Sequence, residues 1–150
     1  MNPKYVHTNL IARDWKSLSA FYQTIFGCVP VPPERHFRGE DLDWGTGISG
    51  AQLDGVHLRL PGYGESGPTL EIFSYNRILP NGGTAVNRAG FGHIAFSTEN
   101  VSELRQKVLA SGGSAVGEIV TLQVATGANV TWCYVTDPEG NIIELQSWSK

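Results

Sequence analysis

The chain repeats a pattern of residues at matched offsets in its two halves. Starting from His7 and from His93, a Leu follows after 11 residues and a Gly follows after 20 residues. A Gly precedes Glu71 by 4 residues, and another Gly precedes Glu144 by the same distance. Self-similarity of this kind indicates that one supersecondary unit occurs twice in the chain.

Length and composition favour placing both copies in one domain. A chain of 150 residues with 41% hydrophobic content can bury one ordinary core. We predict modules at about 1–80 and 88–150, joined by a linker at Arg77–Arg88, within a single domain that spans residues 1–150.

The first half is longer than the second. The His-to-Glu span is 64 residues in the first half and 51 in the second. The polar, Gly-rich stretch Arg35–Gln52 is predicted to be a loop that holds most of the extra residues. Within it, Trp44 is a candidate lid or a hydrophobic plug, and His36 is predicted to be an exposed loop histidine.

Each of the repeated His and Glu residues lies inside a short run that alternates apolar and polar side chains. The four runs are Tyr5–Ile11, Thr69–Phe73, Phe91–Phe96 and Ile142–Gln146. Residues at i and i+2 of a strand share a face, so the ionisable side chains lie opposite the aliphatic ones. One face of each predicted strand then packs in a core, and the other presents an imidazole or a carboxylate.

Two imidazoles and two carboxylates that converge match what a divalent metal ion needs. This predicts His7, Glu71, His93 and Glu144 as metal ligands. A lone strand His is more often a hydrogen-bonded structural residue, and a strand Glu is by default a solvated carboxylate. The matched offsets favour ligation over both alternatives.

Capping residues and apolar spacing predict one helix after the first strand of each half. Asp14 is the predicted N-cap of the first helix, and Gly27 is placed to end it. Asn100 takes the N-cap position in the second half, with Glu103 three residues later, and Ser111-Gly112-Gly113 ends that helix. Further strands are predicted at about 29–32, 55–60, 69–75, 115–120, 129–136 and 141–148, the last two joined by a turn at Asp137–Gly140.

Strand parity also predicts which other side chains share the face of the four ligands. His57 and Arg59 point away from the core face of their strand, toward a cleft or solvent. Trp132 and Tyr134 alternate with apolar neighbours and line the same interior, as packing or as binding residues. These four residues are the candidate substrate contacts.

Charge and composition exclude several classes of partner. A net charge of −3 and a pI of about 5.7 argue against nucleic acid or an anionic membrane as the partner, and a small molecule is expected instead. No apolar stretch approaches the roughly 20 residues that span a bilayer, and the N-terminus lacks the layout of a signal peptide. Cys28 and Cys133 form neither a disulfide framework nor a CxxC motif. They are predicted to be reduced and packed, as in a cytoplasmic protein.

Together these motifs resemble the vicinal oxygen chelate superfamily, also called the glyoxalase/bleomycin resistance/dioxygenase fold. The segments that carry the resemblance are His7, Ala20–Gly27, Leu70–Ile72, Gly92–Phe96 and Asp137–Leu145. The resemblance implies an α+β fold in which two βαβββ modules curl their mixed sheets around a metal-lined cleft. It also implies a homodimer, because the sheets of relatives often close across a subunit boundary.

The ligand order His, Glu, His, Glu is that of the bacterial-type glyoxalase I enzymes. It implies a metal-dependent lyase or isomerase, similar to lactoylglutathione lyase, that abstracts a proton next to a carbonyl through a metal-bound enediolate. Glu144 is the first candidate base and Glu71 the second, with one nickel, cobalt, zinc, manganese or iron ion as cofactor. There are two alternatives: an epimerase or dioxygenase of the same superfamily, or a resistance protein that binds a small molecule. Ile11 stands where glutathione-dependent members commonly carry Arg. The resemblance therefore implies the class of reaction but does not identify the substrate.

Overall fold

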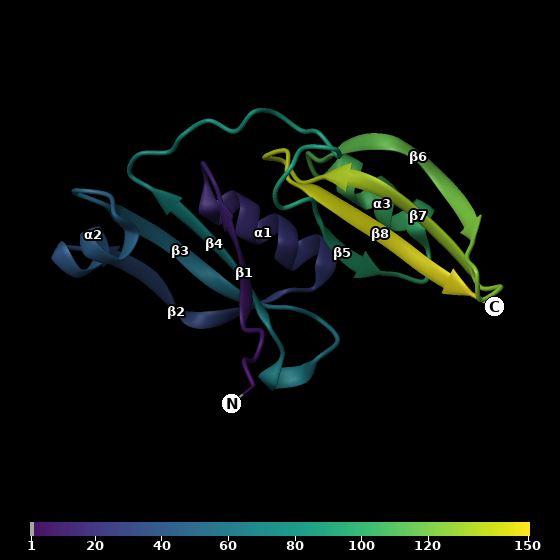
Figure 1. The fold of residues 1–150 in the computed structure, drawn as a ribbon, viewed down its shortest axis with the longest axis horizontal. Helices are drawn as coiled ribbons and strands as arrows, with labels where there is room; N and C mark the ends of the chain where they lie inside the picture. The colour runs from purple at the N-terminus through teal and green to yellow at the C-terminus, as the bar shows by residue number, and fades with distance from the viewer. Residues whose placement is uncertain (1) are drawn as a thin grey trace. The chain divides into compact units, whose positions relative to one another are not determined.

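The strands form two separate four-stranded sheets with the same strand order. In the computed structural model, which describes residues 2–150, the orders are β1-β4-β3-β2 and β5-β8-β7-β6 (Figure 1). The strands of the first sheet are β1 (His7–Ile11), β2 (Val29–Arg38), β3 (Gln52–Arg59) and β4 (Thr69–Tyr75). Those of the second are β5 (Ile94–Ser97), β6 (Ser114–Gln123), β7 (Asn129–Thr136) and β8 (Ile142–Ser149). The helices are α1 (Trp15–Phe26), α2 (Glu40–Thr46) and α3 (Val101–Ala110), with a 3-10 turn η1 (Gly64–Ser66).

Each sheet mixes parallel and antiparallel pairs in the same way. β1 pairs with β4 in parallel, as β5 does with β8, and the remaining neighbours are antiparallel. The prediction of an α+β fold built from two repeated βαβββ modules with mixed sheets is therefore confirmed. The chain divides into two compact units between Pro80 and Asn81, inside the predicted linker. That the two units make up a single domain stays a prediction.

Helix α1 begins and ends where the sequence predicts. The Asp14 carboxylate accepts hydrogen bonds from the backbone N–H groups of Lys16 and Ser17, at 3.0 and 3.1 Å. Gly27 ends the helix with a φ of 68°, which a glycine adopts without steric cost. The buried side chains of α1 pack against β3 and β4, and the largest of them are Leu18, Phe21, Tyr22 and Phe26.

Helix α3 is capped by half of the predicted capping box. Asn100 Oδ1 accepts a hydrogen bond from the backbone N–H of Glu103 at 3.0 Å. The Glu103 carboxylate pairs instead with Lys107 Nζ, one turn along the helix, at 2.8 Å. Val101 and Val108 are the buried residues of α3, and they face the second sheet.

Both sheets carry a register shift at the same place. Between β2 and β3, residues 32–34 stand opposite Val56. Between β6 and β7, residues 117–119 stand opposite Cys133. The repeat therefore extends to an irregularity of the pairing, so positions in the two units can be compared residue by residue.

The prediction of a loop over Arg35–Gln52 is wrong. β2 continues through Arg38, because residues 35–38 pair with β3, and α2 then follows. Helix α2 has no buried residue. Its sequence therefore lacks the regular spacing of apolar residues from which a helix is usually predicted. Most of the extra length of the first unit does lie here, since residues 39–51 join β2 to β3 and residues 124–128 join β6 to β7. The β3–β4 connection, residues 60–68, is also longer than its counterpart at residues 137–141.

Several strand boundaries also differ from the prediction. β1 begins at His7, and Tyr5 and Val6 lie before it and are exposed. β5 begins at Ile94, so His93 precedes its strand instead of lying inside it. β3 begins earlier than expected, at Gln52, and β6 runs on to Gln123, because antiparallel partners extend each strand.

Two side chains of the predicted loop have different surroundings from those expected. Trp44 lies in α2 with 76% of its surface exposed, which excludes a hydrophobic plug. His36 is exposed but lies in β2, where its Nδ1 is 2.6 Å from Asp54 Oδ1 on β3. His36 therefore belongs to a surface network of polar side chains, which also contains Arg38, and not to a loop.

Both cysteines are free and buried, as predicted. Burial raises the pKa of the Cys28 thiol to about 11 and also raises the pKa of Cys133. Among residues 2–150, no helix combines the length and the apolar content that crossing a membrane requires.

The buried thiols give a test of this packing. Because the thiolate is the reactive form, native protein at pH 8 should react slowly with a thiol reagent such as DTNB, and protein unfolded in guanidinium should release two equivalents at once. Rapid labelling of Cys28 or Cys133 in the native protein would contradict the burial described here.

Gly55 gives a second test, since it lies in β3 against β4. A Cβ at Gly55 would lie 2.1 Å from the Ile72 carbonyl oxygen and 2.3 Å from Phe73 Cδ1. Gly55→Ala should therefore destabilise the protein by about 1–3 kcal/mol in a denaturant titration. Gly45→Ala is the matched control, because a Cβ there meets nothing within 4 Å, and removing a helix glycine should stabilise by about 0.5–1 kcal/mol. Equal stability of the Gly55→Ala protein and the wild type would show that the β3–β4 approach is looser than described.

Candidate functional site

In the first unit, parallel pairing brings a His of β1 close to a Glu of β4. Asn9 is the register partner of Glu71, and His7 lies two residues earlier, on the same face of β1. His7 Nε2 is 3.3 Å from Glu71 Oε2. The first of the predicted His–Glu pairs is therefore formed within one sheet.

Glu71 has two further side-chain partners. Asn9 Nδ2 donates a hydrogen bond to Glu71 Oε2 at 3.2 Å. His57, the register partner of Glu71 on β3, places its Nε2 2.9 Å from Glu71 Oε1. Glu71 is buried, with 7% of its surface exposed, so these contacts replace most of its hydration.

Burial lowers the pKa of His57, and the nearby Glu71 carboxylate opposes that change. A neutral imidazole carries one N–H, and an ionised carboxylate can only accept. The Nε2–H tautomer of His57 therefore donates to Glu71 Oε1. The ring of His57 also lies near those of His7 and Phe73, at centroid distances of 6.2 and 5.7 Å.

The second unit holds the equivalent pair. His93 Nε2 is 2.9 Å from Glu144 Oε2, although His93 stands just before β5. The ring of Tyr134 lies 5.0 Å from that of His93, and Trp132 lies 4.9 Å from Tyr134. Trp132 and Tyr134 are thus on the same face as the His–Glu pair, as strand parity predicts.

Arg59 ends β3 on the face of His57 and is half-buried. The structure brings His7, His57 and Glu71 together in the first unit, and His93, Glu144, Trp132 and Tyr134 together in the second. That these side chains contact a substrate stays a prediction.

The geometry of each pair suits two ligands of one metal ion. Two ligand atoms at about 2.1 Å from an ion and at right angles lie about 3.0 Å apart. The Nε2–Oε2 distances of 3.3 and 2.9 Å in the two pairs are close to that value. Within residues 2–150, no group of three or more His, Cys, Asp or Glu side chains is arranged to hold a metal ion. Each unit thus offers two candidate ligands, and their sharing of one ion stays a prediction.

Asn9 is a site residue that the sequence analysis missed. Asn9 lies two residues after His7, so strand alternation puts both side chains on the same face. This spacing was the signal from which Asn9 could have been predicted. The register of β1 against β4, which brings Asn9 beside Glu71, is not readable from spacing alone.

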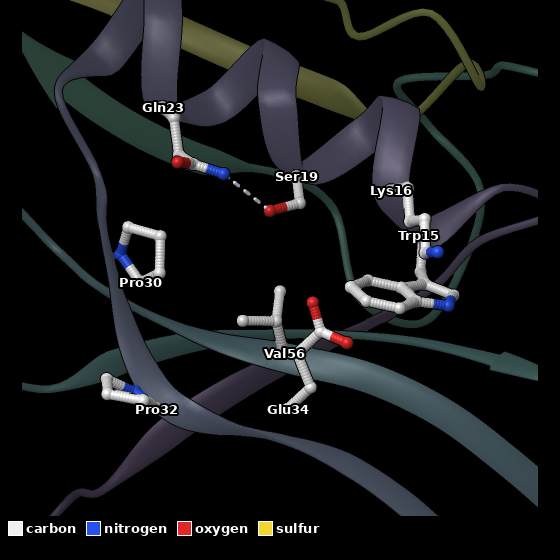
Figure 2. Close-up of a pocket in the computed structure, with 8 residues that line it drawn as sticks. All are labelled: Trp15, Lys16, Ser19, Gln23, Pro30, Pro32, Glu34 and Val56. Carbon is white, nitrogen blue, oxygen red and sulfur yellow. Dashed lines mark hydrogen bonds between the residues drawn. The ribbon is translucent and has the colours of Figure 1, made fainter.

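A pocket of about 410 Å³ lies on the other face of the first sheet, between α1 and β2. Figure 2 shows Ser19 and Gln23 of α1 facing Val56, with Gln23 Nε2 donating to Ser19 Oγ at 2.8 Å. Val56 and His57 are consecutive in β3, so their side chains point to opposite faces. The pocket is therefore separate from the His–Glu pair.

Solved structures share this fold at low sequence identity. A glyoxalase family protein from Bacillus cereus is similar with a TM-score of 0.77 and 19% identity, over 100% of this chain and 95% of that chain. A glyoxalase/bleomycin resistance protein/dioxygenase domain from Frankia sp. EAN1pec gives a TM-score of 0.60 at 17% identity, over 99% of this chain and 100% of that chain. The fosfomycin resistance protein FosX from Listeria monocytogenes, in complex with Mn(II) and sulfate, gives 0.54 at 19% identity, over 98% and 93% of the two chains.

Among curated proteins, none matches the chain. The family model described as the Glyoxalase/Bleomycin resistance protein/Dioxygenase superfamily matches residues 4–145, which include both His–Glu pairs. The chain belongs to the glyoxalase/bleomycin resistance protein/dioxygenase superfamily.

Proposed function

We propose that the protein is a glyoxalase I-like, metal-dependent lyase or isomerase that removes a proton from the carbon next to a substrate carbonyl. The observation that carries the proposal is the recurrence of one His–Glu pair in each unit, at equivalent places in two sheets of identical order. The presence of Mn(II) in the structure of FosX supports a divalent ion as the cofactor.

The proposed ligands are His7, Glu71, His93 and Glu144, with one nickel, cobalt, zinc, manganese or iron ion. The imidazoles would bind through Nε2, the atom of each ring that faces the carboxylate. When bound, such an ion draws electron density from the paired oxygens of a substrate, which acidifies the neighbouring C–H bond. The carboxylates of Glu71 and Glu144 would offset its 2+ charge.

Glu144 is the proposed base, and Glu71 is the second candidate. The Glu144 side chain is 19% exposed and that of Glu71 is 10% exposed, so Glu144 has more room to reach a substrate carbon. A Glu144 carboxylate oxygen would accept the proton and return it to a neighbouring atom of the same substrate. Trp132 and Tyr134, beside His93, would exclude water and orient the substrate.

We also propose that residues 1–150 act as one domain, that the protein is a homodimer, and that it works in the cytoplasm. The two free, buried cysteines fit a reducing compartment. A monomeric sedimentation profile at micromolar concentration would count against the dimer.

The metal assignment predicts the effect of removing either imidazole. His7→Ala and His93→Ala should each lower the Mn2+ content of protein that is stripped with chelator and then reloaded, because each loses a direct ligand. The loss should exceed the roughly 10–100-fold weakening that follows removal of an outer-shell partner. His36→Ala is the control, since His36 is bonded to Asp54 on the other face of the sheet. Full Mn2+ occupancy in both site variants would exclude this ligand set.

The mechanism predicts that Glu144→Gln lowers turnover more than metal affinity. The amide still offers an oxygen but cannot accept a proton at neutral pH, and removing a general base costs about 10²–10⁴-fold in rate. The measurement is turnover on a panel of 2-oxoaldehyde–thiol adducts and acyl-CoA epimers, with exchange of the substrate α-proton followed in D2O. Glu118→Gln, an exposed carboxylate of β6, should leave turnover unchanged.

Oxygen uptake separates this mechanism from a dioxygenase. An enzyme that only moves a proton consumes no O2. If O2 uptake tracks the loss of a substrate, the proton-transfer proposal is wrong and a dioxygenase takes its place.

A further inference from the structure

The two carboxylates of the candidate site have different surroundings, although they occupy equivalent positions. Glu71 is contacted by three side chains, those of His7, Asn9 and His57. Among the residues that the structure describes, His93 is the one side chain within hydrogen-bond or ion-pair distance of Glu144. The repeat makes this contrast a direct comparison between matched sites.

The contrast comes from the residues on the neighbouring strands. The register partners of Glu71 are Asn9 in β1 and His57 in β3. At the same register positions beside Glu144 stand Ala95 in β5 and Tyr134 in β7. The side chain of Ala95 has no hydrogen-bonding group, and the Tyr134 ring packs against His93. Neither contact that holds Glu71 has a counterpart at Glu144.

The two carboxylate oxygens of Glu71 have different partners. Oε1 is 2.9 Å from His57 Nε2, whereas Oε2 faces His7 Nε2 at 3.3 Å and accepts from Asn9 at 3.2 Å. Rotation of the carboxylate would break the His57 and Asn9 bonds together. Bonds to a buried, ionised carboxylate are among the stronger ones in proteins, so this orientation is held firmly.

We propose that His57, assisted by Asn9, is a positioning residue that fixes Glu71 as a one-oxygen metal ligand. Oε1 is bonded to His57, so Oε2, which lies beside His7, would be the oxygen that binds the ion. Held in this way, Glu71 would stay a ligand and would not act as a base, and Glu144 would accept the proton. His57 consequently orients a ligand and does not contact the substrate. This inference rests on the proposed function, because it concerns the same metal ion.

The test measures Mn2+ binding to the full-length protein by calorimetry, after removal of bound metal. His57→Phe keeps a ring at this position but removes the N–H, and it should weaken Mn2+ binding about 10–100-fold, the usual cost of losing an outer-shell partner. His57→Gln retains a donor and should restore binding to within a few-fold of wild type. His36→Gln, a histidine that also contacts carboxylates but lies on the other face, should change nothing. Asn9→Leu provides an independent variant and should weaken binding in the same direction.

A metal-free readout separates orientation from ligation. In a crystal structure of metal-free His57→Phe protein, the Glu71 carboxylate should rotate away from His7 Nε2, while the distance between His93 and Glu144 stays as in the wild type. An unchanged Glu71 side chain in that variant overturns the positioning role.

The outcomes distinguish the failure of this inference from the failure of the proposed function. Wild-type protein that binds no Mn2+ or other divalent ion overturns both. Wild-type binding with unchanged affinity in His57→Phe overturns the positioning role alone. A loss in His57→Phe as large as that in His7→Ala, without rescue by His57→Gln, also overturns it, because His57 is then a direct ligand.

Discussion

The candidate site depends on the parallel pairing of the first strand of each unit with the fourth. β1 beside β4, and β5 beside β8, bring a His from near the start of a unit next to a Glu from near its end. A parallel pair requires a long crossover, and α1 and α3 supply the helix of that crossover in the two units. The apolar faces of β3, β4, β7 and β8 pack beneath these helices, so the ionisable groups are left on the opposite face. The core and the site are thus two sides of the same strands.

Repetition of this unit does not by itself produce a symmetric site. The two sheets agree in order, in direction and even in the place of their register shift. They differ in the side chains beside the two carboxylates, where His57 in one unit corresponds to Tyr134 in the other. Backbone pairing therefore sets where a carboxylate stands, and the side chains on the neighbouring strands set how many hydrogen-bonding partners it has.

The sequence alone predicts the features that depend on single residues or on close neighbours along the chain. Asp14 and Gly27 bound α1 because capping and a positive φ are properties of single residues. The face of Glu71 follows from alternation with Leu70 and Ile72, both fully buried.

Features that depend on a partner strand were not predictable in the same way. β2 runs on through Arg38 because β3 lies alongside it, although residues 34–38 are mostly charged or polar and follow several prolines. Helix α2 has no buried residue, and the signals available in its sequence were the acidic first turn and Gly47 at its C-terminal end, where φ is 71°. The contact of His57 with Glu71 requires the register of β3 against β4, which spacing does not give.

The unequal hairpins of the two units have a practical consequence for protein engineering. The first unit already carries residues 39–51 between β2 and β3, whereas the second closes the same connection with residues 124–128. Val124 and Ala128 are joined there by a backbone hydrogen bond of 2.8 Å, which fixes the ends of the loop. Doubling the length of a flexible loop costs only about 0.6 kcal/mol in closure entropy. The tip of the β6–β7 hairpin is therefore the natural place to graft a peptide tag or a reporter segment, since its counterpart in the first unit tolerates a whole helix.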